Sequence, residues 1–228
     1  MKSAALTLVV ALSLSASAFA QQEARNEREY REDYTQVIVG LRNTLPSGNA
    51  VQNVRWGDLV SGGIGVDVQY AELWRASSWV YGGWYAGVNI DSFGGRTSSQ
   101  TDPTTGLAAE FRTDRLNTAD LEFGGRLRQN FNGFHIDENV GVGAVMYMKE
   151  DVANRSTGID KLEFIKSSVN YMFDFGIRVG APVGKNVELN LGLAFQVNGA
   201  PDAGKDFSTL NFRPMQNLVL GLSLDIGF

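Results

Sequence analysis

The chain contains no cysteine and only one histidine in its 228 residues. Without cysteine there is no disulfide framework, no thiol chemistry and no lipid anchor on an N-terminal cysteine. One histidine and no thiolate leave only carboxylates as metal ligands, and no spaced calcium-loop pattern occurs among them. The sequence therefore predicts no metal site and no cofactor, and the fold must be held together without cross-links.

Positive charge and long apolar stretches are also scarce. The formal net charge is −5 at pH 7, which argues against nucleic acid as a partner. After residue 20, no apolar stretch reaches the roughly 20 residues that a transmembrane helix needs. Any membrane insertion must therefore be by β-strands.

The N-terminus has two segments outside the predicted fold. Residues 1–20, "MKSAALTLVVALSLSASAFA", combine Lys2, an apolar stretch and a small-residue end, which predicts a secretory signal peptide cleaved after Ala20. A membrane-spanning helix is the alternative, but the apolar stretch is short and interrupted by serine. Residues 21–33 are charged and lack an apolar stripe, which predicts a flexible lead, with a docking peptide as the alternative.

Regular alternation dominates the remainder, residues 34–228. In the closing "LVLGLSLDIGF", Leu, Ile and Phe occupy one parity, and Val, Gly, Ser and Asp occupy the other, as in a strand with one apolar face. Seven further segments alternate in the same way: 34–42, 58–73, 79–91, 115–129, 134–148, 168–180 and 186–198. Glu138 falls on the apolar parity, which predicts a β-bulge there or a strand that begins near Asn139.

The connections between these segments alternate in length. The short ones are 75–78, 130–133 and 181–185, and the long ones are 43–57, 92–114, 149–167 and 199–215. The long connections are rich in Gly, Asp, Thr and Pro, as expected for loops. The pattern predicts an all-β, up-and-down antiparallel barrel of eight strands, with one tight-turn rim and one rim of long loops.

The apolar face of such a barrel points either inward, as in a lipocalin, or outward to lipid. The polar parity is rich in glycine and other small residues, which suit a narrow lumen. After the predicted signal peptide, lysine is absent from the strand interiors and occurs only in predicted loops or at strand ends, at Lys149, Lys161, Lys166, Lys185 and Lys205. We therefore predict a transmembrane barrel with a lipid-facing apolar exterior.

Aromatic residues predict two girdles at the membrane interfaces. One set follows the tight turns: Trp74, Trp79, Phe131, Phe134 and Phe228. The other set lies near the long loops: Trp56, Phe93 and Phe164.

Charged residues on the polar parity must neutralise one another, because the lumen is too narrow for free water. The candidates for ion pairs in the lumen are Arg126, Arg128, Arg178, Asp120, Glu122 and Asp174.

The terminal "LDIGF" resembles the C-terminal signature of Gram-negative outer-membrane β-barrels. With eight strands the chain is similar to the small OmpA-, OmpX- and OmpW-type barrels. This resemblance implies that Leu224, Ile226 and Phe228 form a signal for the barrel-assembly machinery. It also implies export past periplasmic chaperones, location in the outer membrane, and contact with outer-membrane lipid and lipopolysaccharide.

Some barrels that this chain resembles modify lipid A with a histidine, a serine and a carboxylate near the outer leaflet. Here the only histidine, His135, follows a tight turn and is expected at the opposite rim, so we predict no catalytic residues. The sequence favours a non-enzymatic structural or surface-interaction role through the long loops, with an unknown extracellular ligand. The alternatives are a narrow channel for small solutes and a lipid-modifying enzyme.

Overall fold

The computed structural model describes residues 33–101, 108–154 and 157–228. The predicted signal peptide, and all of the predicted lead except Asp33, lie outside the described residues. Among the described residues, no helix is both long enough and apolar enough to cross a membrane.

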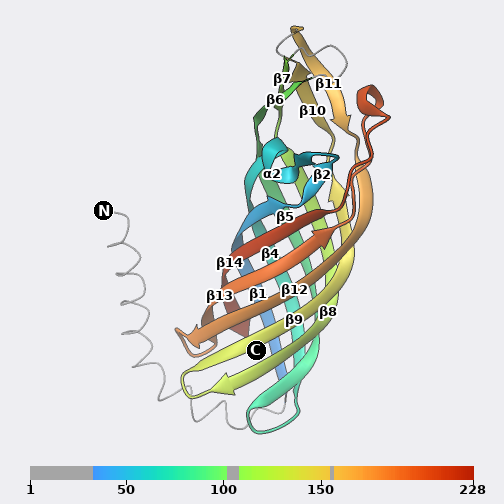
Figure 1. Cartoon of the computed structure of the whole chain (residues 1–228). Coiled ribbons are helices and arrows are strands. Elements are labelled where there is room, and N and C mark those ends of the chain that lie inside the picture. Colours follow the sequence, from blue (N-terminus) through green and yellow to red (C-terminus); the bar gives the residue numbers. More distant parts are fainter. Residues whose placement is uncertain (1–32, 102–107, 155–156) are drawn as a thin grey trace, which may run out of the picture.

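Eight long antiparallel strands form a closed barrel, which confirms the predicted fold class (Figure 1). They are β1 (Asp33–Ser47), β4 (Val60–Arg75), β5 (Val80–Gly95), β8 (Leu116–Phe131), β9 (Phe134–Tyr147), β12 (Ser168–Pro182), β13 (Val187–Asn198) and β14 (Met215–Gly227). Each strand pairs with its neighbours along the chain, and β1 closes the ring by pairing with β14. Closure satisfies the backbone of every barrel strand on both edges, as a bilayer requires.

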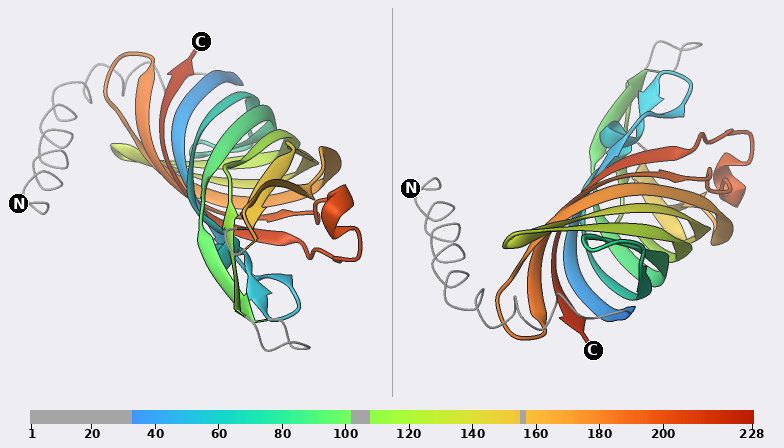
Figure 2. Two further views of the ribbon diagram at one scale, coloured as in Figure 1. Left: turned by 90° about the horizontal axis from the view of Figure 1, so that it is seen from above. Right: turned by 90° about the horizontal axis from the view of Figure 1, so that it is seen from below.

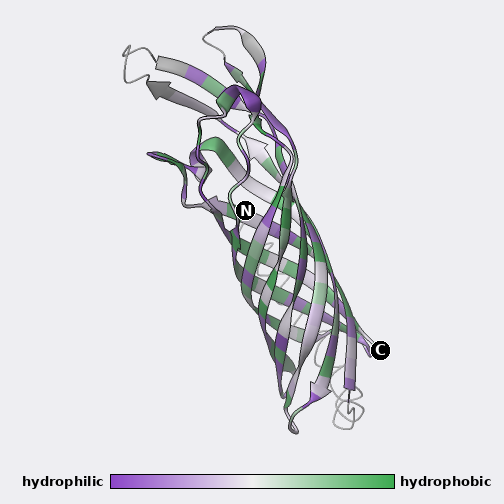
Figure 3. Cartoon of the chain, turned by 90° about the vertical axis from the view of Figure 1, so that its right-hand side faces the viewer, coloured by the Kyte–Doolittle hydropathy of each residue, from purple (hydrophilic) through white to green (hydrophobic). Residues whose placement is uncertain are grey.

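The apolar parity of the strands points outward, as predicted. On β14, Leu222 and Leu224 are exposed, whereas Ser223 and Asp225, which alternate with them, are buried in the lumen. The other barrel strands repeat this alternation, and hydrophobic and hydrophilic residues follow one another along the ribbons in Figure 3. An apolar exterior over a polar interior is the reverse of a soluble barrel and matches lipid as the surrounding medium.

The two rims differ as the connection lengths predicted. Short turns join β4 to β5, β8 to β9 and β12 to β13 at one end, here called the lower rim. The chain's C-terminal end lies at this rim, away from the long connections (Figures 1 and 2). In the turn after β8, Gly133 adopts φ 94°, a conformation that favours glycine.

The long connections are not the loops that the sequence predicted. They contain β2 (Asn49–Val51), β3 (Val54–Arg55), α2 (Trp56–Leu59), β6 (Thr97–Thr101), β7 (Ala108–Thr113), β10 (Glu150–Asn154), β11 (Ile159–Ile165) and the short 3₁₀ helix η1 (Lys205–Phe207). We call this assembly at the upper end the crown (Figure 1). Its strands are too short and too polar to show a clear alternation, and they are stabilised by pairing with each other in one four-stranded and one two-stranded sheet.

The predicted irregularity in β9 is wrong. β9 begins at Phe134 and pairs with β8 and β12 through Glu138 without a register shift. Glu138 lies on the outward parity near the lower rim, and its Oε1 atom accepts a hydrogen bond of 3.4 Å from Gln129. A charged residue is tolerated there because the free-energy cost of placing a charged side chain on the lipid-facing surface falls toward the membrane interfaces.

Candidate functional site

The lumen of the barrel contains most of the buried charged side chains among the described residues. Four guanidinium groups face it, from Arg42, Arg126, Arg128 and Arg178. Eight carboxyl groups face it as well, from Asp67, Asp91, Asp120, Glu122, Asp137, Asp174, Glu188 and Asp225. Small residues leave room for these side chains: a Cβ atom at Gly141 would collide with the Tyr85 hydroxyl, and one at Gly40 with Asp67.

Arg128 is the centre of the lower lumen. Its Nε and Nη2 atoms donate to the two carboxylate oxygens of Asp137 at 2.6 and 2.7 Å, a bidentate geometry. Its Nη1 atom donates to Glu188 at 2.8 Å, and Nη2 lies 3.4 Å from Asp225. All four side chains are almost completely buried, so one guanidinium holds together three carboxylates from three different strands.

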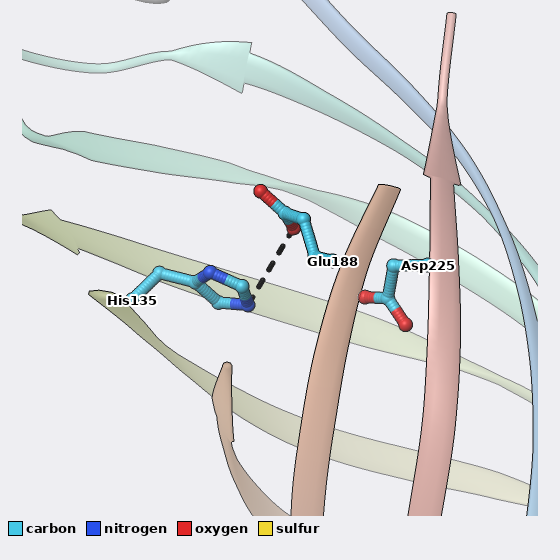
Figure 4. Close-up of side chains that lie close together, drawn as sticks. All are labelled: His135, Glu188 and Asp225. Atoms are coloured by element: carbon cyan, nitrogen blue, oxygen red, sulfur yellow. Dashed lines mark ion pairs between the residues drawn. The ribbon is translucent and has the colours of Figure 1, made fainter. Parts of the chain in front are cut away.

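His135 adds a fifth member to this group, which we call the lower network. Its Nε2 atom lies 3.6 Å from Glu188, 2.8 Å from Asn190 Oδ1 and 3.1 Å from Arg128 Nη2. In Figure 4, His135, Glu188 and Asp225 converge in the lumen from β9, β13 and β14.

A metal ion is one possible occupant of this convergence. The three side chains offer ligand atoms within 4.8 Å of one another, which makes them a candidate metal site. However, the Arg128 guanidinium already contacts all three and supplies the positive charge that a metal ion would bring. The geometry therefore favours a closed ion-pair network over a metal centre.

The middle of the lumen is organised around an amide. Gln69 donates from Nε2 to Glu122 at 2.8 Å, and its Oε1 atom accepts from both Arg126 and Arg178. Gln69 thus bridges two positive groups to one negative group without direct contact between them. Arg126 also donates to Asn139 at 2.9 Å and lies over the Tyr85 ring at 4.9 Å.

Further up the lumen, Arg42 contacts Asp91 at 3.2 Å and donates to Gln196 at 2.9 Å. Gln196 in turn donates to Asp120 at 2.8 Å. A cavity of about 60 Å³ lies between the middle and upper groups, lined by Asp67 and Asp174 among others. It has room for a few water molecules but not for a solute pathway.

Above this level an apolar cluster, here called the upper plug, closes the barrel. The members from the crown and the connections include Trp56, Leu59, Val152, Phe164 and Ile165, all buried. They pack against residues at the upper ends of the barrel strands: Val60, Phe93, Leu116, Val145, Tyr147, Met172 and Met215. Phe212 covers the cluster by stacking on Trp56 at 5.7 Å.

The upper plug corrects one prediction, and the lower rim agrees with another. Trp56, Phe93 and Phe164 do not form an upper girdle facing lipid. Trp56 and Phe93 are both 0% exposed: Trp56 is buried in α2 of the crown, and Phe93 lies on the inward parity of β5 together with Asn89 and Asp91. At the lower rim, Trp74, Trp79, Phe131, Phe134 and Phe228 are exposed, as the predicted girdle requires. The Phe131 and Phe134 rings stack at 4.8 Å.

The six residues predicted for ion pairs in the lumen all lie on the inner face of the barrel. The structure brings Arg126 and Arg178 together with Glu122 through Gln69, and it places Asp174 beside the cavity. Arg128 has its partners elsewhere, in Asp137, Glu188 and Asp225. Leu224, Ile226 and Phe228, the predicted assembly signal, are exposed on the outer face at the lower rim.

Sequence reasoning missed Asp137, His135 and Gln69 as parts of these networks. Asp137 and His135 share their parity with Asn139, a signal that was hidden because Glu138 made the first half of β9 look irregular. Gln69 gave no signal, because a bridging amide is recognised only once both of its partners are placed.

The second candidate site is the crown sheet, whose strand order is β11-β10-β7-β6. One of its edges is covered: beside β11, Gly204 donates its N–H to Phe164 O at 2.8 Å, and Ile165 bridges to Ala203. The opposite edge is β6, which pairs only with β7 within the described part of the chain. A free edge presents unpaired N–H and C=O groups to solvent.

The crown also buries a carboxyl group. Glu150 is 2% exposed, and neither of its oxygens has a hydrogen-bond partner among the described residues. Burial, reinforced by the nearby charges of Asp114 and Asp151, raises the pKa of Glu150 to about 8. The group is therefore neutral at pH 7 and compatible with the apolar surroundings of the upper plug.

No protein-family description and no curated protein sequence matches the chain. Solved structures do match. A major outer membrane protein of Thermus thermophilus superposes with a TM-score of 0.50 at 14% identity, over 85% of this chain and 99% of that one. Its likeness, together with the closed barrel and apolar exterior, shows that this chain has the fold of an outer-membrane β-barrel.

Two other structures match with lower TM-scores. The Ail protein of Yersinia pestis, solved with the heparin analogue sucrose octasulfate, gives 0.48 at 9% identity, over 87% of this chain and all of that one. The outer membrane protease OmpT of Escherichia coli gives 0.47 at 8% identity, over 86% of this chain and 96% of that one.

Proposed function

We propose that the chain is a non-enzymatic protein of the outer membrane whose crown binds an extended polypeptide segment at the free edge of β6. The observation that carries this proposal is the asymmetry of the crown sheet: the β11 edge is covered by the chain itself, whereas the β6 edge has no partner strand among the described residues. Edge strands are usually blunted, and binding by strand addition uses one that is open.

The closed lumen supports a surface role over a channel. The lower network, the Gln69 bridge and the upper plug follow one another along the barrel axis, and the cavity between them measures about 60 Å³. Planar-bilayer recordings test the channel alternative. We expect no steady conductance from the wild type, and a stable open level would favour the channel.

The position of the only histidine supports a non-enzymatic role. His135 lies in the lower lumen, among Arg128, Glu188 and Asn190, and away from the crown. A serine, histidine and acid set near the outer leaflet therefore has no histidine to use. Lipid A mass spectra from cells with and without the protein test the enzyme alternative, and we expect identical spectra.

The binding proposal is tested with the full barrel in nanodiscs and a displayed library of random linear peptides. Ser98→Pro and Ser99→Pro form a matched pair, because the N–H groups of successive strand residues point to opposite edges. The proline that removes an N–H bonded to β7 disrupts the crown sheet. The other proline removes only an N–H on the open edge.

We expect the library to yield extended peptides that bind the wild type. They should fail to bind the proline variant whose crown keeps wild-type protease protection. Peptides that bind this variant as well as the wild type would contradict strand addition at β6. Recovery of no peptide from the wild type would contradict the proposed function.

A further inference from the structure

The open edge of β6 borders a polar groove of about 380 Å³ between the crown sheet and the β2–β3 hairpin. Its polar lining consists of Asn53, Asp58, Arg96, Thr97, Ser98 and Ser99. Asn53 belongs to the turn between β2 and β3, and Asp58 to the short helix α2. A volume of this size falls within the range of ligand-binding clefts.

The groove meets β6 at its edge and not at one of its faces. Side chains of successive strand residues point to opposite faces, so a cleft on one face touches every second residue. This groove is lined by three consecutive residues, Thr97, Ser98 and Ser99. A segment bound in the groove therefore lies along the unpaired backbone of β6.

The two charged residues of the groove differ in what they already bind. The carboxylate of Asp58 accepts a hydrogen bond of 3.1 Å from the backbone N–H of Arg55, at the start of α2. The guanidinium of Arg96 is exposed and has no hydrogen bond or ion pair within the described part of the chain. The positive charge is thus the one that is free to recognise a ligand.

The backbone of Arg96 is fixed although its guanidinium is free. Its N–H donates to the Thr113 hydroxyl at 2.8 Å, and the Thr113 N–H donates to Arg96 O at 2.9 Å. Thr113 is itself buried, and its hydroxyl also donates to Leu59 O. The backbone of Arg96 is therefore held beside the groove by the buried part of the crown, which lowers the ordering cost of binding.

We propose that Arg96 pairs with an acidic side chain of the bound strand, so that the crown selects extended segments that carry Asp or Glu. This inference rests on the proposed function and adds the chemistry of the partner. A guanidinium binds a carboxylate through two parallel hydrogen bonds. The hydroxyl groups of the groove and the β6 backbone bind the rest of the segment and carry little side-chain selectivity.

The test uses two synthetic strand peptides of alternating Thr and Val that differ only by Glu or Gln at the centre. Binding to the full barrel in nanodiscs is measured for the wild type, Arg96→Gln and Arg96→Glu. The control is Arg115→Gln, which removes an exposed arginine that does not line the groove. Inorganic phosphate and free glutamate are added as competitors.

We expect the wild type and Arg115→Gln to bind the Glu peptide about tenfold more tightly than the Gln peptide, a factor that corresponds to about 1.4 kcal/mol. Arg96→Gln should bind both peptides equally. A third peptide with Lys at the centre completes the test: Arg96→Glu should bind the Lys peptide more tightly than the Glu peptide, a reversal that a merely structural role of Arg96 would not produce.

Different failures separate the two proposals. The wild type could bind the Glu and Gln peptides equally well, while the proline variant that lacks only an N–H on the open edge binds neither. This result would overturn the acidic preference and leave strand addition intact. Failure of the wild type to bind either peptide would overturn both. Competition by phosphate as strong as that by glutamate would identify a general anion site, as for a lipid or saccharide phosphate, and would overturn the assignment to polypeptide.

Discussion

At the lower end of the lumen, one guanidinium holds three buried carboxylates, whereas at the upper end Trp56, Phe93 and their neighbours exclude charge almost completely. The lower network uses only barrel strands, whose alternation fixes the direction of each side chain. The upper plug combines strand ends with residues of the crown, such as Trp56, Val152 and Phe164. The lower closure is therefore part of the barrel, and the upper closure depends on how the crown packs onto it.

The two closures also differ in how they respond to a change. Removing one partner of a buried ion pair costs more stability than the whole pair contributes, because the other partner stays buried and unpaired. An apolar cluster loses roughly in proportion to the volume removed. Substitutions at the two ends should therefore have effects on stability that differ in magnitude, in the part of the molecule that unfolds and in their dependence on pH.

The largest effect is expected from Arg128→Met, which leaves Asp137, Glu188 and Asp225 without their shared cation. We expect the free energy of unfolding to fall by about 3–5 kcal/mol, with a value near the top of this range because three carboxylates lose their partner. Urea unfolding in lipid vesicles measures the loss. Arg178→Met is the matched control, because Arg178 donates only to the Gln69 amide among the described residues. Equal losses for the two variants would contradict the central role of Arg128.

Trp56→Ala should come second, with a loss of about 3 kcal/mol from the cavity it creates in the upper plug. The loss should appear as faster proteolysis of the crown. The barrel should stay folded, and we expect both the variant and the wild type to change mobility on heating in detergent gels. Trp79→Ala at the lower rim is the control, because Trp79 is 50% exposed and its ring lies beside that of Phe131 at 6.3 Å. Barrel unfolding that accompanies crown cleavage would show that the two ends do not respond separately.

Glu150→Gln should change how crown stability depends on pH. The carboxyl has a pKa of about 8 in the folded chain and an ordinary value of 4.5 when exposed. At pH values between these two pKa values, Glu150 is ionised in the unfolded crown but keeps its proton in the folded crown. The stability of the wild-type crown therefore falls as the pH rises through this range, and it levels off above pH 8.

A glutamine side chain at this position cannot ionise, so the Glu150→Gln crown should lose this slope and exceed the wild type by about 1–3 kcal/mol above pH 8. Protease protection of the crown on both sides of pH 8 measures the difference. Parallel pH profiles for the two proteins would contradict the buried, unpaired state of Glu150.

The smallest effect is expected from Lys166→Ala. Lys166 contacts Asp202 at 3.2 Å in the crown, but both side chains are 54% exposed. Solvent screens such pairs, so we expect the crown to lose less than about 1 kcal/mol of stability, and still less when salt is added. Crown proteolysis measures the loss. A loss close to that of Arg128→Met would remove the contrast between exposed and buried pairs on which the comparison depends.

Some features of the fold were predictable because they depend on local geometry. The outward face of β14, from Leu218 to Ile226, follows from the two-residue period of a strand and from the absence of lysine on either face. The lower girdle was predictable for a related reason: Trp79 and Phe131 lie next to turns that are too short to bury them. In contrast, Trp56 and Phe164 lie in connections long enough to fold back, and their direction was not fixed by the neighbouring sequence.

The order of amino acids was enough to predict the number of barrel strands, their succession and which face of each meets lipid, because backbone alternation and the need for a closed sheet act on every segment alike. The carboxylates that meet Arg128 could be identified only in the folded barrel, because Glu188 and Asp225 lie 60 and 97 positions away along the chain. The stagger of strands around the barrel sets those contacts. Which edge of the crown sheet is covered and which is open could likewise be identified only in the folded structure, because edge pairing depends on which segments come together in space.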